Sequence, residues 1–164
     1  MIKTFNKFFY VGILALIFSN NLRHTEAATL VPVSGYEFVK QVKSQEKDKN
    51  KLIFLFTSWC GHCKKSIPEI IQMFQDQTLK TDLIMLSLDK NQALIEKFVE
   101  MHMQNLDINI YYIPYSDEIL EMFGELKINY RSTIPHITIL NRNNTPIFDG
   151  FSDLKQIENI LRQN

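Results

Sequence analysis

The feature that most constrains this chain is a pair of cysteines separated by two residues, Cys60 and Cys63, which are its only cysteines. The preceding run, Lys51 to Thr57, is apolar with β-branched and aromatic residues, which predicts a strand buried on both faces. After the pair, apolar residues recur at helical spacing at positions 67, 70, 71 and 74. The cysteines are therefore expected where a buried strand passes into a helix.

The position of the cysteines at a strand–helix junction predicts how they react. A helix N-terminus carries partial positive charge and free backbone N–H groups, which favour a thiolate. We therefore expect Cys60 to be the exposed attacking thiol and Cys63, one turn inside the helix, to be the resolving thiol. A disulfide between them closes a short ring and constrains the unfolded chain little, so stability is a poor reason for the pair.

The first 27 residues have the pattern of an export segment. Lys3 and Lys7 provide positive charge, Phe8 to Phe18 is apolar, and Thr25 to Ala27 offers small residues for cleavage. The apolar run is short for a transmembrane helix, so we expect a signal peptide at residues 1–27, with an N-terminal membrane anchor as the alternative. Residues 28–164 then form one domain in the periplasm or at the extracytoplasmic face of the membrane, where disulfides persist.

Charge and motif spacing exclude two classes of function. The formal net charge is zero, and no basic stripe is present, which argues against nucleic acid as a partner. Covalent haem attachment needs histidine directly after the second cysteine, and Lys64 stands there.

Predicted strands and helices alternate along residues 28–164. Ser34 with Glu37 fits a capping box, Ser116 and Ser152 are expected helix caps, and Pro68 is expected to kink the helix that follows the cysteines. Strands are expected at 29–33, 51–57, 83–88, 108–112, 137–140 and 146–148, the last two as a hairpin. This pattern predicts an α/β fold with a central mixed sheet flanked by helices.

Three motifs together resemble the thioredoxin superfamily. They are Trp59 directly before the cysteine pair, Pro68 five residues after Cys63, and Ile134-Pro135 ahead of the terminal hairpin. The additional helix and strand at 91–112, before that proline, are similar to the insertion of the exported TlpA/ResA-like branch. By contrast, the Cys-Gly-His-Cys sequence is similar to that of the protein disulfide isomerases.

The resemblance implies a thioredoxin-like fold and a redox-active disulfide that exchanges with protein substrates, without cofactor or resident metal. Cys60 attacks a substrate disulfide, Cys63 displaces the product, and an unidentified partner recycles the pair. His62 is expected to donate a hydrogen bond or positive charge to the Cys60 thiolate. The resulting potential should lie between about −270 mV for thioredoxin and about −180 mV for disulfide isomerase.

The resemblance also implies a substrate-binding set. Pro135 matches the cis-proline of the superfamily, and Ile134 would offer its backbone to a bound substrate strand. Trp59 is expected to lie over the site as an apolar contact, and His136 to lie beside it.

Two positions depart from the superfamily. Phe54 stands where thioredoxins carry a buried acid, and Ser66 stands where many TlpA/ResA-like proteins carry glutamate. The usual proton acceptors for Cys63 are therefore missing. His136 is a candidate substitute, and the alternative is a solvent-facing loop histidine.

A second class of function uses the same cysteines, namely a copper chaperone or a non-catalytic thioredoxin-fold binding module. The methionines at positions 73, 85, 101, 103 and 122 fit core and helix positions better than a copper cluster. A zinc site would need further ligands such as His62 and His136, so redox chemistry is favoured. The sequence leaves the direction open, because oxidation or isomerisation suits His62 and reduction suits the TlpA/ResA-like branch.

Overall fold

The computed structural model of the chain describes residues 28–45, 47–75, 78–103, 106–114, 117–151 and 153–163. The expected export segment, residues 1–27, and the expected caps Ser116 and Ser152 lie outside the described residues. Within those ranges, no helix combines the length and apolar character needed to cross a bilayer.

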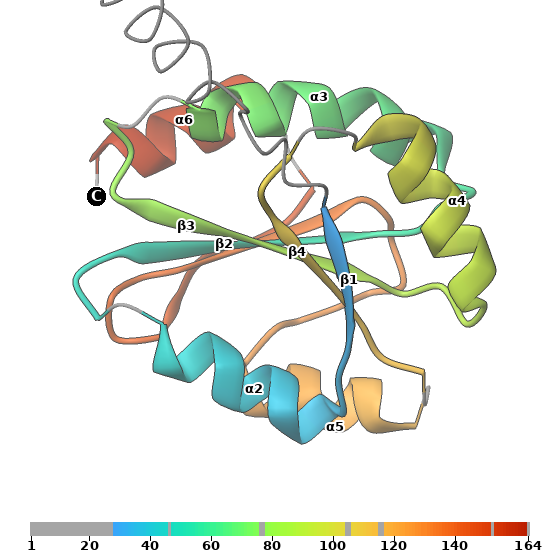
Figure 1. The fold of residues 1–164 in the computed structure, drawn as a ribbon. Helices are drawn as coiled ribbons and strands as arrows, with labels where there is room; N and C mark the ends of the chain where they lie inside the picture. Colours follow the sequence, from blue (N-terminus) through green and yellow to red (C-terminus); the bar gives the residue numbers. More distant parts are fainter. Residues whose placement is uncertain are drawn as a thin grey trace, which may run out of the picture.

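One mixed sheet organises the described part of the chain (Figure 1). Its strands are β1 (Thr29–Pro32), β2 (Asn50–Phe56), β3 (Thr81–Ser87), β4 (Asn109–Tyr112), β5 (His136–Leu140) and β6 (Pro146–Gly150). Their spatial order is β1-β4-β3-β2-β5-β6. The first four run parallel, whereas β5 pairs antiparallel with β2, and β6 pairs antiparallel with β5. The mixed α/β sheet predicted from the sequence is confirmed.

Helices cover both faces of this sheet (Figure 1). They are α2 (Gly35–Ser44), α3 (Gly61–Gln75), α4 (Gln92–His102), α5 (Glu118–Glu125) and α6 (Leu154–Gln163). The apolar residues of α3, α4 and α6 pack into one core cluster, and those of α2 and α5 pack into a second cluster on the other face. The first cluster contains both cysteines.

Strand β2 belongs to both clusters, since every residue in it is buried. Phe54 and Phe56 face the cluster that contains the cysteines, whereas Ile53 and Leu55 face the α2/α5 cluster. This alternation explains why the sequence of β2 is apolar throughout rather than at every second residue. The strand that leads into the cysteine pair is thus enclosed on both faces of the sheet.

The expected helix and strand between residues 91 and 112 are present as α4 and β4. Strand β4 lies between β1 and β3 and pairs in parallel with both. Strand β4 therefore widens the sheet between β1 and β3 and takes no part in the pairing of β2 with β3 and β5.

Helix α2 begins with the capping box that the sequence predicts. The Ser34 hydroxyl accepts a hydrogen bond from the Glu37 amide at 3.1 Å, and the Ser34 amide donates to the Glu37 carboxylate at 2.8 Å. These bonds to Ser34 lower the pKa of the exposed Glu37 carboxyl. At α6 the Asp153 carboxylate accepts from the Gln156 amide at 2.8 Å, next to the expected cap Ser152.

Helix α3 runs from Gly61 to Gln75 with Pro68 inside it. Strand β6 extends to Gly150 instead of ending after Phe148. The extension of β6 follows from its pairing with β5, because Asp149 lies opposite Thr138 and accepts a hydrogen bond from its hydroxyl at 2.8 Å. The polar residue Asp149 thus extends β6 because its side chain has a hydrogen-bond partner on β5.

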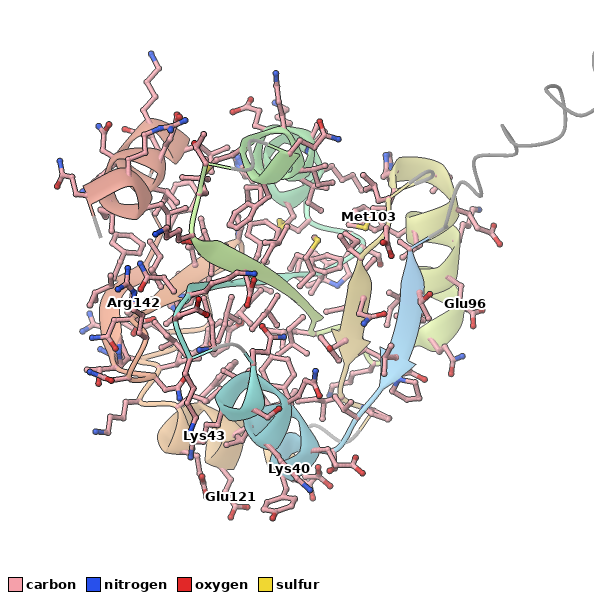
Figure 2. All side chains as sticks on the ribbon, turned by 60° about the vertical axis from the view of Figure 1, so that its left-hand side comes forward. Lys40, Lys43, Glu96, Met103, Glu121 and Arg142 are labelled. Atoms are coloured by element: carbon pink, nitrogen blue, oxygen red, sulfur yellow. A yellow bond between two sulfur atoms is a disulfide. The ribbon has the colours of Figure 1, made fainter. Side chains whose placement is uncertain are left out.

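Charged side chains lie on the outside of the helix layers, whereas Met103 is fully buried in the cluster that contains the cysteines (Figure 2). Lys40 and Lys43 of α2 and Glu121 of α5 are exposed and project outward. Lys43 also pairs with Glu125 at 3.1 Å across the two helices. At this level of exposure such a pair contributes only a few tenths of a kcal/mol up to about 1 kcal/mol.

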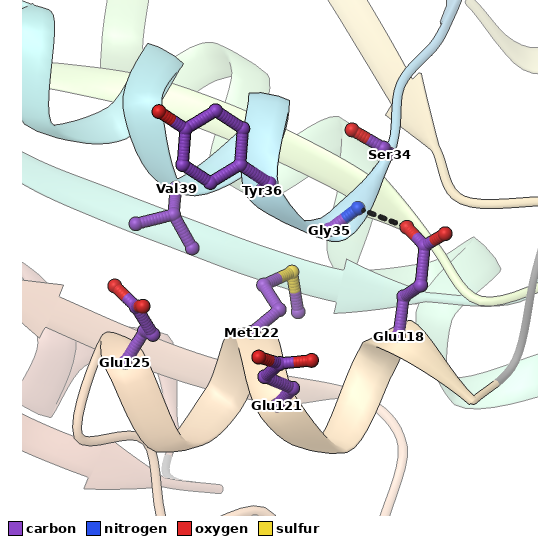
Figure 3. A pocket seen from close by; sticks show the side chains of 8 residues that line it. All are labelled: Ser34, Gly35, Tyr36, Val39, Glu118, Glu121, Met122 and Glu125. Carbon is purple, nitrogen blue, oxygen red and sulfur yellow. Dashed lines mark hydrogen bonds between the residues drawn. The ribbon is translucent and has the colours of Figure 1, made fainter.

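A pocket of about 260 Å³ lies between α2 and α5 (Figure 3). At its edge the Gly35 amide, at the start of α2, donates to the Glu118 carboxylate at 2.6 Å. The two helices approach closely here, because a Cβ at residue 35 would lie 2.9 Å from the Glu118 carbonyl oxygen. Gly35 is therefore required for helix packing on the face opposite the cysteines.

We predict that Gly35→Ala lowers the free energy of unfolding by about 1–3 kcal/mol, the range for overpacking in a close contact. Urea unfolding followed by circular dichroism measures the change. Gly124→Ala is the matched control, since a Cβ there meets nothing within 4 Å, and it should stabilise α5 by roughly 0.5–1 kcal/mol. Equal stability of the two variants would contradict this account of the α2/α5 contact.

Candidate redox site

The cysteine pair lies at the end of β2, where a tight turn leads into α3. The Cys60 amide donates to the Thr57 carbonyl at 3.2 Å, which closes the turn, and the Lys64 amide donates to the Cys60 carbonyl at 3.1 Å, which starts the helix. Helix α3 begins at Gly61. The strand-to-helix junction expected from the sequence is confirmed, with Cys60 directly before the helix.

Cys60 and Cys63 form a disulfide in this structure. Cys60 retains 7% of its surface exposed, whereas Cys63 has none. The Cys63 amide also donates to the Cys60 sulfur at 3.1 Å. After reduction, this N–H group and the start of α3 favour a thiolate at Cys60 rather than at Cys63.

The peptide bond between Ile134 and Pro135 is cis, as expected from the sequence. The Ile134 carbonyl oxygen lies 3.8 Å from the Cys60 sulfur. Pro135 then leads directly into β5, whose residue His136 pairs with Leu55 of β2. Two segments separated by some seventy residues of sequence therefore meet at the disulfide.

The side chains around the disulfide differ in exposure. Trp59 is 69% exposed, Ile134 is half-buried, and His62, Lys64 and Lys65 are exposed on the first turns of α3. The open side of the site thus combines an aromatic surface with groups that carry positive charge when protonated.

His136 is placed differently from expectation. Its ring is 2% exposed, and Nε2 lies 2.7 Å from the Asp149 carboxylate. The ring also packs edge-on against Tyr130, which belongs to the α2/α5 cluster, while the next residue, Ile137, packs in the cluster of Cys63. His136 therefore faces away from Cys63 across the sheet, which corrects both the solvent-facing alternative and the role as direct proton acceptor.

The side chains at the two positions that lack the usual acid do not replace it as proton acceptors. Phe54 is fully buried in the cluster with the cysteines, and Ser66 is half-buried on α3. The proton released by Cys63 therefore has no carboxylate partner at these two positions.

One buried acid near the site was not singled out from the sequence. Asp89 follows β3, is 4% exposed, and hydrogen-bonds both the amide and the hydroxyl of Ser58, two residues before Cys60. The signal for it is an acidic residue at the carboxyl end of a strand that neighbours β2, because carboxyl ends of parallel strands share one edge of a sheet.

The described residues contain no group of three or more His, Cys, Asp and Glu side chains that could hold a metal ion. His62 and His136 lie apart, since one is exposed on α3 and the other is buried on the other face of the sheet. Met85 and Met103 belong to the core cluster that contains the cysteines and Met73 packs against it, whereas Met122 belongs to the other cluster and Met101 is exposed.

The sheet topology, the disulfide at a helix N-terminus and the adjacent cis-proline define a class, the thioredoxin-like thiol–disulfide oxidoreductases. A family profile described as Thioredoxin-like matches residues 48–145, a range that includes both cysteines and Pro135. The chain belongs to this Thioredoxin-like family.

Individual relatives agree with this family. The thioredoxin of Staphylococcus haemolyticus is 29% identical over 77 residues, which cover 47% of this chain and 70% of its own length. The exposed lipoprotein thioredoxin of Streptococcus pneumoniae matches with a TM-score of 0.59 at 15% identity, over 74% of this chain and 90% of its own. StoA of Bacillus subtilis matches with a TM-score of 0.53 at 22% identity, over 70% and 84%. A secreted disulfide oxidoreductase of Mycobacterium tuberculosis matches with a TM-score of 0.52 at 13% identity, over 71% and 83%.

We predict that His136→Ala leaves the rate at which Cys63 resolves a mixed disulfide within about twofold of the wild-type rate, because the ring lies on the other face of the sheet. The free energy of unfolding should fall by about 1–3 kcal/mol, since Asp149 loses one of its buried partners. Stopped-flow release of a thiol from the mixed disulfide measures the rate. A loss of resolution with unchanged stability would restore a direct role for His136.

Proposed function

We propose that this protein is an exported thiol–disulfide oxidoreductase that exchanges disulfides with extended segments of protein substrates. The observation that carries the proposal is the Cys60–Cys63 disulfide at the start of α3, next to the cis bond before Pro135. Cys60 is the more accessible of the two cysteines, so the mixed disulfide with a substrate forms on Cys60.

The exchange is written here in the reducing direction. The Cys60 thiolate attacks one sulfur of a substrate disulfide, forms a mixed disulfide and releases the other sulfur as a thiolate, which takes up a proton. Cys63, as thiolate, then attacks the Cys60 sulfur and releases the second substrate thiolate. The Cys60–Cys63 disulfide forms as two electrons pass to the substrate. Oxidation of a substrate dithiol follows the same steps in reverse.

Substrate binding is proposed at three residues that surround the sulfurs. Ile134 presents backbone groups beside the disulfide, and a substrate in extended conformation would pair with them by strand addition. Trp59, at 69% exposure, would provide apolar contact, and the buried Pro135 would fix the backbone of Ile134 beside Cys60. Backbone pairing with modest apolar contact suits many protein sequences rather than one.

Export is part of the proposal. It rests on the charged start, the apolar run and the small residues of the segment 1–27. The printed names of two structural neighbours, an exposed lipoprotein and a secreted oxidoreductase, are consistent with it. Whether residues 1–27 act as a cleaved signal or as an anchor, the domain would work in the periplasm or at the extracytoplasmic face of the membrane and depend on a redox partner there.

We predict that the chain reduces insulin disulfides with dithiothreitol as the electron source, and that Cys60→Ser lowers the rate by at least about a thousandfold because it removes the nucleophile. Turbidity of the released insulin B chain measures the rate. Copper and zinc titrations of the reduced protein run in parallel. Tight metal binding without insulin reduction would assign the cysteines to a metal chaperone instead.

His62 generates a further prediction. A histidine between the cysteines stabilises the Cys60 thiolate and with it the dithiol form, so His62→Pro should make the couple more reducing, toward about −270 mV. Equilibration with glutathione buffers of known ratio measures the potential of both proteins. A wild-type potential already as reducing as that of thioredoxin would remove this role of His62.

A further inference from the structure

Asp89 is a buried carboxylate with an unusual set of partners. Its Oδ2 accepts from the Ser58 amide at 2.7 Å and from the Ser87 hydroxyl at 2.8 Å, and its Oδ1 accepts from the Ser58 hydroxyl at 2.8 Å. All three partners are donors, which is the pattern that an acceptor-only carboxylate satisfies. Ser87 is fully buried and Asp89 is 4% exposed, so little solvent reaches this charge.

This carboxylate is connected to Cys60 through a single peptide unit. The peptide between Thr57 and Ser58 donates its N–H to Asp89, and its carbonyl accepts the N–H of Cys60 at 3.2 Å. Hydrogen bonds in such a chain polarise one another, so the charge of Asp89 strengthens the bond that closes the active-site turn. Asp89 therefore holds the turn, and its negative charge is linked to the Cys60 amide through one peptide unit.

We propose that Asp89 is a positioning residue of the redox pair, whose buried charge opposes the Cys60 thiolate and shifts the couple toward the reducing side. The inference rests on the proposed function for its significance in the cell, although its physical part concerns Cys60 alone. At a given separation, like charges in a poorly solvated site repel more strongly than in water. A less stable thiolate means a less stable dithiol form, and hence a more reducing couple.

Other charged groups belong to the segments next to Cys60 and Asp89. His62, Lys64 and Lys65 on α3 and Lys90, the residue after Asp89, are exposed, and positive charge on them would favour the thiolate. His136 lies on the other face of the sheet. Because these groups are the same in every variant described below, a difference in Cys60 alkylation between the wild type and the Asp89 variants is due to the change at Asp89.

The test measures alkylation of the reduced chain by iodoacetamide across pH, with the modified cysteine identified by peptide mass mapping. In Asp89→Asn the rate profile should move to lower pH, and alkylation of Cys60 below the midpoint should be at least about threefold faster, since one pKa unit corresponds to tenfold. Equilibration with glutathione should show a correspondingly more oxidising couple. Asp89→Ser provides a second neutral variant if Asp89→Asn does not fold.

Two controls separate charge from other effects. Asp82→Asn removes the same charge at the opposite end of β3, where Asp82 pairs with Lys49 at 3.3 Å, and should leave the profile unchanged. Ser58→Ala keeps the carboxylate and removes one donor from it, so any shift should be to higher pH. A shift to lower pH in Ser58→Ala as large as that in Asp89→Asn would overturn the proposal in favour of turn geometry.

An unchanged or upward-shifted profile in both neutral Asp89 variants would also overturn the proposal. Failure of the proposed function gives a different result. In that case the wild-type chain does not reduce insulin, while the Asp89 variants still differ from it in alkylation, because alkylation requires no turnover.

Discussion

The pairing of β2 with its two neighbours is the interaction on which the redox site depends. Because β2 runs parallel to β3 and antiparallel to β5, its carboxyl end meets the carboxyl end of β3 and the start of β5. The turn that carries Cys60, the carboxylate of Asp89 and the cis bond before Pro135 therefore lie at one edge of the sheet. Burial on both faces fixes the position of β2, and β2 in turn positions the redox site.

Much of this arrangement could be predicted from the sequence because the signals are local. An apolar run such as β2, a capping box such as Ser34 with Glu37, and a cysteine pair at a strand–helix junction each depend on neighbouring residues. The cis bond at Pro135 was predicted by resemblance to a family rather than from local physics, and the structure contains it.

What the sequence did not predict depends on contacts between distant segments. The interpretation of His136 as a proton acceptor was based on its place after Pro135, but strand alternation turns its side chain to the other face, where Asp149 binds it. The role of Asp89 was missed for the corresponding reason, since its partner Ser58 lies 31 residues earlier in the chain. A shift of one residue along a strand turns a side chain to the other face of the sheet, and a neighbouring strand can bring in a residue that is distant in sequence. Both determine which side chains reach the sulfurs.

The sheet also divides the molecule into two layers with different tasks. Both cysteines pack with α3, α4 and α6, whereas α2 and α5 form a separate cluster behind the sheet. Electron exchange uses groups from the first layer and from one edge of the sheet. Substitutions on the outer surface of α2 and α5 should therefore change the contacts that the protein makes with its surroundings without altering the chemistry at the sulfurs.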